Sequence, residues 1–374
     1  MGDSIAIRML FALLRSSLHN VQPEREAFEG AGEQDWKLCF NMASRQGVLA
    51  LAWEGVLKLE QRLHPPKGLK FQWGMSVEKY EQKHRRYCEA AQELQQFYRE
   101  NGIVAVQMKG VGFSANYNVP AHREGGDIDI YTYSADEKAM GHREANLLAD
   151  RLVGEKGIEV DHSHSYKHSN FYFKGIPIEN HKFFLNVKTY PKFLGSLNEV
   201  LWRCLNPVEV TFYEGKYRIL VPSPQFNMLF ISCHAFQHYG SGIALHHLYD
   251  WAALLKRNNL VIPDEVKETN FLRALAAFTH LANKYLGTEQ DISFLPQDYT
   301  ALADEMLEEM LYPKFDSVVP HSNPLAVIFY KFRRVLRSAK LSYDVLGASP
   351  VRRFLSSVVA HIKAPDMILN RGEK

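Results

Sequence analysis

The sequence predicts an α+β protein in which a β-rich core lies between two helical regions. Over residues 34–60, apolar residues recur every three or four positions, which is the spacing of one helix face. Runs rich in β-branched residues fall within 103–221, and the β character disappears after Pro222-Ser223-Pro224. We therefore divide the chain into an N-terminal helical region at 1–100, an α+β core at 101–222 and a C-terminal helical domain at 223–374.

Helices are predicted for the first hundred residues. An amphipathic helix opens the chain, and the helical pattern continues until the segment HPPKG at 64–68 interrupts it. A long polar helix is expected over 76–100, because Asn101-Gly102 follows as a stop signal. A helix of this length is expected to lie across another domain.

The core is predicted to combine short strands with helices. Its expected elements are a strand at 103–108, a short helix at 111–118, a strand at 127–133, a helix at 135–154, β-like runs at 157–163, 169–175 and 176–183, and a hairpin at 208–221. The remainder of the chain, after residue 224, reads as helical.

The charge of the chain is nearly balanced, with 44 basic and 42 acidic residues and a formal net charge of +2. No specific nucleic-acid partner is therefore expected. The four cysteines are scattered without a C-x-x-C motif, which favours neither a zinc site nor disulfides and suits the reducing cytoplasm. No stretch approaches the roughly 18 to 20 uninterrupted apolar residues of a membrane span.

Two acids interrupt the strand predicted at 127–133. Because alternate residues of a strand share a face, Asp127 and Asp129 project together while Ile128 and Ile130 face the core. Their Cα atoms would lie about 6.6 Å apart, so both carboxylates could reach one hard cation. Without a cation the like charges repel, and replacing either acid by asparagine is expected to raise the melting temperature of the metal-free protein. The alternative is a pair of acids on a solvated sheet face.

The surroundings of this motif carry a family resemblance. A strand followed by Lys109-Gly110, a short helix, a loop with an arginine and then DIDI resembles the nucleotidyltransferase superfamily, which includes DNA polymerase β and the aminoglycoside nucleotidyltransferases. More narrowly, the chain is similar to the bacterial uncharacterised nucleotidyltransferase family, in which lysine-glycine replaces the usual Gly-Ser. The segments that carry this similarity are QDWKLCFNMASRQGV, GIVAVQMKG, HREGGDIDI, IPIENHKF, LWRC and HAFQH.

The resemblance implies a nucleotidyltransferase-like mixed β-sheet and a third carboxylate on a strand beside the aspartates. Glu179 in IPIENH is favoured for that position, and Asp161 in GIEVDHS is its rival. In this interpretation Asp127, Asp129 and Glu179 are catalytic and hold Mg²⁺, with Mn²⁺ as an alternative, and Glu179 is a candidate to accept the proton of the attacking hydroxyl. Paired cations suit nucleotidyl transfer because they neutralise the phosphate oxygens and activate that hydroxyl.

The nucleotide is expected to contact the residues around the two aspartates. Lys109 and Gly110 lie where the chain leaves a strand for a helix, a place that suits the β- and γ-phosphates of a nucleoside triphosphate. Gly126 allows close approach, and Arg123 could either reach phosphate or brace the acids. The predicted reaction transfers a nucleoside monophosphate to a hydroxyl of an unknown small-molecule or saccharide acceptor. Two alternatives are a histidine-rich metal-dependent hydrolase and a non-catalytic nucleotide-sensing or antitoxin-like module.

The histidines leave several interpretations open. His162, His164 and His168 are close in sequence, while His234 and His238, like His246 and Asp250, are four apart on predicted helices. Such pairs could bind a transition metal, pack within the helices, or line a cleft with His181 and hold an acceptor or phosphate.

The C-terminal stretch is basic, because residues 331–374 contain ten basic and three acidic residues. Interleaved apolar residues make it amphipathic. It is expected either to touch an anionic membrane surface or another polyanion, or to cap a domain with a solvated face.

Overall fold

The computed structural model describes residues 4–136, 140–162, 167–185, 193–240, 242–312, 324–347, 349 and 351. Its N-terminal part consists of the helices α1 (Ile5–His19), α2 (Glu33–Arg45), α3 (Leu49–Lys58) and α4 (Lys67–Glu100). Helix α4 begins at Lys67 rather than at the predicted residue 76. The reason is local: Pro66 is its N-cap residue, so the prolines that break the preceding pattern also start the next helix.

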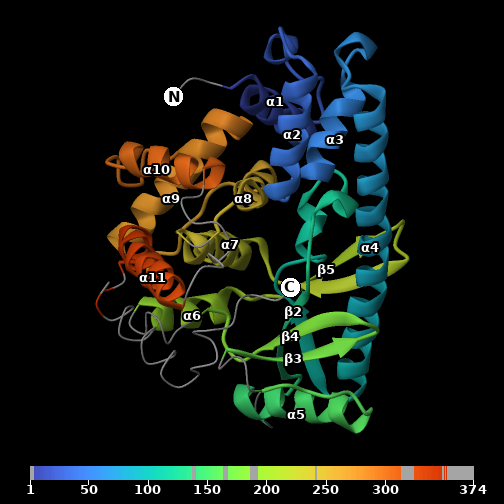
Figure 1. Ribbon diagram of the computed structural model, residues 1–374. Helices are drawn as coiled ribbons and strands as arrows, with labels where there is room; N and C mark the ends of the chain where they lie inside the picture. The colour runs from blue at the N-terminus through green and yellow to red at the C-terminus, as the bar shows by residue number, and fades with distance from the viewer. Residues whose placement is uncertain are drawn as a thin grey trace.

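Helix α4 joins the N-terminal helices to the β-rich core, as its length predicted (Figure 1). Near its beginning, the indole of Trp73 donates a hydrogen bond to the backbone oxygen of Leu49 on α3. Near its end, the amide of Gln95 both donates to and accepts from the backbone of Leu220. One helix thus fixes the core relative to the N-terminal bundle.

The central sheet has four strands, β1 (Ile103–Gln107), β2 (Ile128–Ser134), β3 (His168–Phe173) and β4 (Ile176–His181). Their order is β1-β2-β4-β3, with β2 and β4 parallel and the two outer pairs antiparallel. The α+β class and the mixed sheet are therefore confirmed. A separate hairpin, β5 (Val208–Phe212) and β6 (Tyr217–Val221), forms where it was predicted.

Three predicted elements of the core differ from the structure. Within 157–162, the run GIEVDHS forms one isolated bridge between Asp161 and Asn170 rather than a strand. Helix α5 (His142–Glu155) begins later than residue 135, because Gly141 and the Glu144 side chain form its N-terminal cap. The short helix expected at 111–118 is one 3₁₀ segment, η3 (Phe113–Asn116).

Helices from both ends of the chain share one hydrophobic core. The helices after the sheet are α6 (Phe193–Cys204), α7 (Pro224–His238), α8 (Leu245–Arg257), α9 (Thr269–Leu281), α10 (Thr300–Leu311) and α11 (Pro324–Leu346). Helix α1 contacts α8, where the hydroxyls of Ser17 and Tyr249 lie 2.9 Å apart. A second core lies between the sheet, α4, α5 and the hairpin. The division of the chain at residues 100 and 222 stays a prediction.

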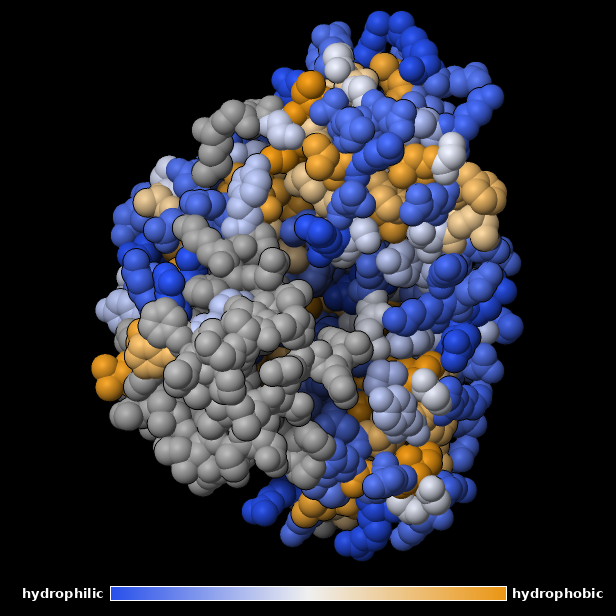
Figure 2. Space-filling view, viewed as in Figure 1, coloured by the Kyte–Doolittle hydropathy of each residue, from blue (hydrophilic) through white to orange (hydrophobic). Residues whose placement is uncertain are grey.

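The face seen in Figure 2 is hollowed near its centre, and hydrophilic residues lie along the upper and right borders of the hollow. In the described part of the chain, no helix combines the length and apolar character needed to cross a membrane. The basic stretch, for which the sequence left a membrane, a polyanion or a domain cap open, begins in α11, where Arg337 pairs with Glu309 of α10. Residues 352–374 of that stretch lie outside the described residues.

Candidate functional site

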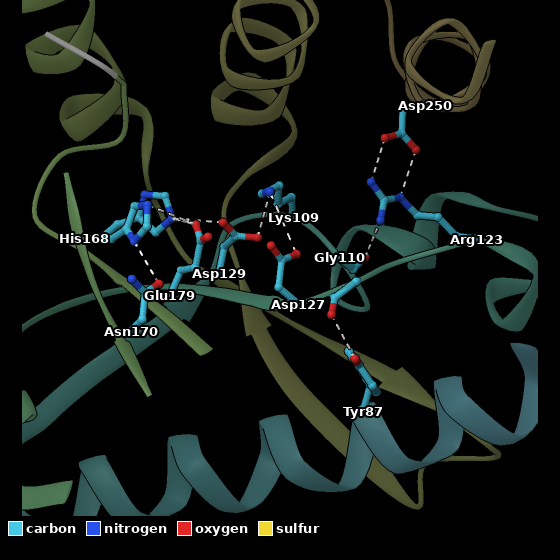
Figure 3. Close-up of polar contacts among 12 residues, drawn as sticks. Tyr87, Lys109, Gly110, Arg123, Asp127, Asp129, His168, Asn170, Glu179 and Asp250 are labelled. Atoms are coloured by element: carbon cyan, nitrogen blue, oxygen red, sulfur yellow. Dashed lines mark hydrogen bonds and ion pairs between the residues drawn. The ribbon is translucent and has the colours of Figure 1, made fainter. Parts of the chain in front are cut away.

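Three carboxylates meet at one end of the central sheet. The parallel register places Asp129 of β2 directly opposite Glu179 of β4, and Asp127 lies one residue before β2. The side chain of Asp129 is fully buried, whereas those of Asp127 and Glu179 are 34% and 27% exposed. Figure 3 shows these acids grouped around Lys109 and His168. The two neighbouring strands therefore bring together the residues expected to bind a cation.

Asp161, the rival third acid, lies at a different place. It pairs with Asn170 of β3, which in turn pairs with Glu179 of β4. Strands β3 and β4 therefore separate Asp161 from Asp129, a distance of about 14 Å at the usual strand spacing. The geometry favours Glu179.

Lys109 follows β1 and contacts both aspartates. Its Nζ lies 3.0 Å from Oδ2 of Asp129 and 3.9 Å from Oδ1 of Asp127. Burial lowers the pKa of Lys109, but the charges of Asp129 and Asp127 outweigh burial and raise it. The ammonium of Lys109 thus lies where a cation can balance both acids.

His181 joins the other side of the carboxylate group. Its Nε2 lies 2.9 Å from Oδ1 of Asp129 and 3.2 Å from Oε2 of Glu179, and the ring is fully buried. Burial alone would raise the pKa of Asp129, yet Lys109 and His181 hold it well below its usual range. In contrast, burial and then the charge of Asp129 raise the pKa of Asp127 to about 6. The pKa values of the two acids are therefore shifted in opposite directions.

This asymmetry corrects one expectation from the sequence. Repulsion between the acids was expected to destabilise both, but Asp129 is compensated by Lys109 and His181. Replacing Asp129 by asparagine would leave those two buried partners without their anion, and we therefore expect it to destabilise the fold. Only Asp127 fits the original expectation.

The residues present fit a divalent cation. Asp129, Glu179 and His181 each offer a ligand atom, and these atoms lie within 4.8 Å of one another. Asp127 is not part of this set, and its place among the metal ligands stays a prediction. Carboxylate oxygens are the ligands that Mg²⁺ prefers, and a histidine nitrogen also suits Mn²⁺. His181, predicted from the sequence to line a cleft, therefore lies within the carboxylate group itself.

A match to a family model covers residues 32–287 and describes an uncharacterised nucleotidyltransferase. The chain belongs to this family. The three carboxylates, Lys109 and His181 all lie within the matched range. No curated protein matches the chain. Among solved structures, it is similar to an antigenic nucleotidyltransferase-like protein from Paracoccidioides brasiliensis, at 14% identity and a TM-score of 0.38, over 55% of this chain and 93% of that one.

Arg123 of this nucleotidyltransferase-family protein does not contact the three acids. Its guanidinium makes two bonds to Asp250 of α8, Nε to Oδ1 at 2.8 Å and Nη2 to Oδ2 at 2.7 Å. Its Nη1 also donates to the backbone oxygen of Gly110, and the hydroxyl of Tyr117 donates to Asp250. Arg123 therefore braces the turn after Lys109 against the C-terminal helices. Its role in nucleotide binding stays a prediction.

The structure requires glycine at one of the two predicted nucleotide-binding glycines, Gly110, and not at the other, Gly126. Gly110 has a φ of +68°, and a Cβ added there would lie 3.1 Å from the backbone oxygen of Asp127. Both the left-handed conformation and this close approach favour glycine. A Cβ at Gly126 would meet no atom within 4 Å, so no contact in the protein itself requires glycine there.

The histidines divide into separate groups. His168 lies 3.6 Å from Glu179 and His162 lies 3.6 Å from Asp150, while His164 falls outside the described residues. His234 and His238 of α7 are joined by His247 of α8, which the sequence analysis missed. The two adjacent histidines at 246–247 were the sequence signal for a residue near His234 and His238. Helical spacing paired His246 with Asp250, but the residue that joins the group is His247.

Proposed function

We propose that this protein is a Mg²⁺-dependent nucleotidyltransferase that moves a nucleoside monophosphate from a nucleoside triphosphate to a hydroxyl acceptor and releases pyrophosphate. The observation that carries the proposal is the in-register pair Asp129 and Glu179, with Asp127 beside it and Lys109 as the balancing cation. Membership of the nucleotidyltransferase family supports it. Free, buried thiols at all four cysteines suit the cytoplasmic location that we propose.

The site residues divide the work of the reaction. Mg²⁺ held by Asp127, Asp129 and Glu179 would neutralise phosphate oxygens and activate the acceptor hydroxyl. His181 contacts Asp129 and Glu179 and so orients both carboxylates. Glu179 is partly exposed and is the acid that can accept the proton of an incoming hydroxyl. Asp129 is held ionised by its buried neighbours and remains an anionic ligand at neutral pH.

A cavity beside His181 supports a small-molecule or saccharide acceptor. Its volume is about 650 Å³, and Tyr131, His142 and Asn146 are among the residues that line it. Pockets of roughly 300 to 1,000 Å³ are typical of small-molecule sites. We therefore propose that the acceptor approaches the carboxylates from this side.

The experiment that tests the function measures, in one reaction, the transfer of a labelled α-phosphate to a product and the release of pyrophosphate. The protein is incubated with Mg²⁺, an α-labelled nucleoside triphosphate and a metabolite extract, with each of the four bases in turn. We expect one labelled product and an equal amount of pyrophosphate, with Mn²⁺ able to replace Mg²⁺. Nucleotide binding without transfer would support the non-catalytic module, and zinc, iron or manganese bound by the histidines would support the hydrolase.

Lys109→Ala is expected to strengthen the binding of Mg²⁺ alone and to weaken the binding of the nucleoside triphosphate. Removing the ammonium from Asp129 removes the competitor of Mg²⁺, so calorimetric titration with Mg²⁺ alone should show tighter binding. Triphosphate binding in saturating Mg²⁺ should weaken by about 1.5 to 3 kcal/mol, the range for a hydrogen bond to a charged group. Monophosphate binding should barely change. Lys174→Ala is the matched control, since Lys174 forms a half-exposed pair with Glu93. Equal losses for both nucleotides would remove Lys109 from the phosphate site.

A further inference from the structure

Three imidazole rings converge where α7 and α8 meet. The ring centroids of His234 and His238 lie 4.7 Å apart, and that of His247 lies 5.7 Å and 5.1 Å from them. His247 is buried, and the other two are half-buried. One nitrogen from each ring lies within 4.8 Å of the others, so these histidines could contact one shared ligand.

The hydrogen bond that His247 makes to the backbone indicates that its free ring nitrogen donates a hydrogen bond to a ligand and does not bind a metal ion. Its Nδ1 accepts the backbone N–H of Ala244 at 3.1 Å. A neutral imidazole has one lone pair and one N–H, and the lone pair of His247 is used in this bond. Its Nε2 therefore carries the proton. A ligand that accepts a hydrogen bond suits this ring, whereas a metal ion would require the lone pair that Ala244 already occupies.

The charges around the cluster are also positive. Burial and then the ammonium of Lys109 lower the pKa of His234 and of His238, and Lys167 lowers both further. His247 lies in the first turn of α8, where the helix dipole adds partial positive charge. A positive local field repels a metal cation and attracts an anion. A neutral imidazole ring still donates one hydrogen bond, so a lowered pKa does not prevent these histidines from binding an anion.

We propose that His234, His238 and His247, together with Lys109, bind phosphate groups, and that the ligand is the polyphosphate end of the nucleoside triphosphate. Lys109 connects the two halves of this arrangement, because its ammonium contacts Asp127 and Asp129 and its charge lowers the pKa of His234 and His238. A triphosphate whose α-phosphate lies at the carboxylates would extend its remaining phosphates past Lys109 to α7 and α8. The choice of triphosphate rests on the proposed function.

Calorimetric titration of the full chain with sodium tripolyphosphate in EDTA tests the site without metal or catalysis. We expect His234→Gln and His247→Ala each to weaken tripolyphosphate binding at least tenfold. His280→Ala, on α9, is the matched control and should leave the affinity unchanged. If His247→Ala does not fold, His238→Gln, at a half-buried position of α7, tests the same site. Thermal melts of each variant establish which variants fold.

The possible results separate this site from the proposed reaction. Tripolyphosphate binding that is lost in the histidine variants supports the site, even if no nucleotidyl transfer is ever found. Unchanged tripolyphosphate affinity in all three variants overturns it. Inorganic phosphate that binds as tightly as tripolyphosphate, with the same losses, overturns the triphosphate assignment and points to a phosphorylated acceptor. One equivalent of zinc bound by wild type and lost in His234→Gln, without any tripolyphosphate effect, replaces the anion site with a metal site.

Discussion

Asp127→Asn is expected to lower Mg²⁺-dependent nucleotide turnover by at least about 10²- to 10³-fold, the effect of removing one preorganised electrostatic group from a reaction centre. The substitution keeps the shape of the side chain and removes the negative charge that a metal ion requires. The fold should be unaffected, because the side chain of Asp127 is one third exposed. Its nearest charged partner, Lys109, still has its ion pair with Asp129 in the variant. Initial rates at saturating Mg²⁺, with circular dichroism as the folding control, provide the measurement.

The same substitution should make the metal-free protein more stable at neutral pH. The pKa of Asp127 is raised from 3.8 to about 6, so the folded state retains a proton that the unfolded chain releases between these values. The contribution of Asp127 to stability is therefore greatest below about pH 4, falls as the pH rises from about 4 to 6, and stays at its lowest value above that range. After a discount for partial exposure, the loss at pH 7.5 is roughly 1 to 2 kcal/mol, and asparagine at this position avoids it.

Asp129→Asn provides the matched comparison. It should abolish turnover as well, but it should destabilise the metal-free protein by about 3 to 5 kcal/mol, because Lys109 and His181 lose their shared buried anion. Urea unfolding in EDTA at pH 4 and pH 7.5 compares the two variants with wild type. Retention of wild-type turnover by either variant would refute the metal assignment. A loss of stability in Asp127→Asn at pH 7.5 would refute the pKa argument.

Asp250→Asn is expected to destabilise the protein by about 3 to 5 kcal/mol, the usual result of removing one partner from a buried ion pair. The side chains of Arg123 and Asp250 are only 10% and 5% exposed, so the guanidinium would be left buried with a neutral partner. The substitution also weakens the support that Arg123 provides to the backbone of Gly110. We therefore expect triphosphate affinity to fall together with stability.

Urea unfolding measures the stability effect, and Glu265→Gln is its control. Glu265 pairs with Arg203 at the surface, with both side chains more than half exposed, and such a pair contributes about 0 to 1 kcal/mol. If Asp250→Asn lowers the free energy of unfolding by no more than Glu265→Gln does, then Asp250 does not hold Arg123 in solution. The role of Arg123 in contacting phosphate directly would then become the better explanation.

Local sequence patterns determined much of the fold and part of the site. The alternation of acids and isoleucines at 127–130 predicted that Asp127 and Asp129 project together, because side chains alternate along a strand. Both carboxylates indeed lie beside Lys109. Glycine at position 110 likewise follows from a left-handed backbone conformation. The boundaries of α4 and α5 were less predictable, because a proline and a capping glycine set them rather than apolar periodicity.

The partners of each charged group were decided by tertiary structure alone. The sequence identified Asp129 as an acid, but its pKa depends on Lys109, which follows β1, and on His181, 52 residues away on β4. Arg123 was expected either to reach phosphate or to brace the acids, and the packing of α8 supplies it with Asp250, 127 residues away. Strand register and helix packing determine which charges meet when the chain folds. The sequence by itself therefore determined which chemical groups this protein carries at one end of its central sheet, and only the tertiary structure decided how those groups are paired.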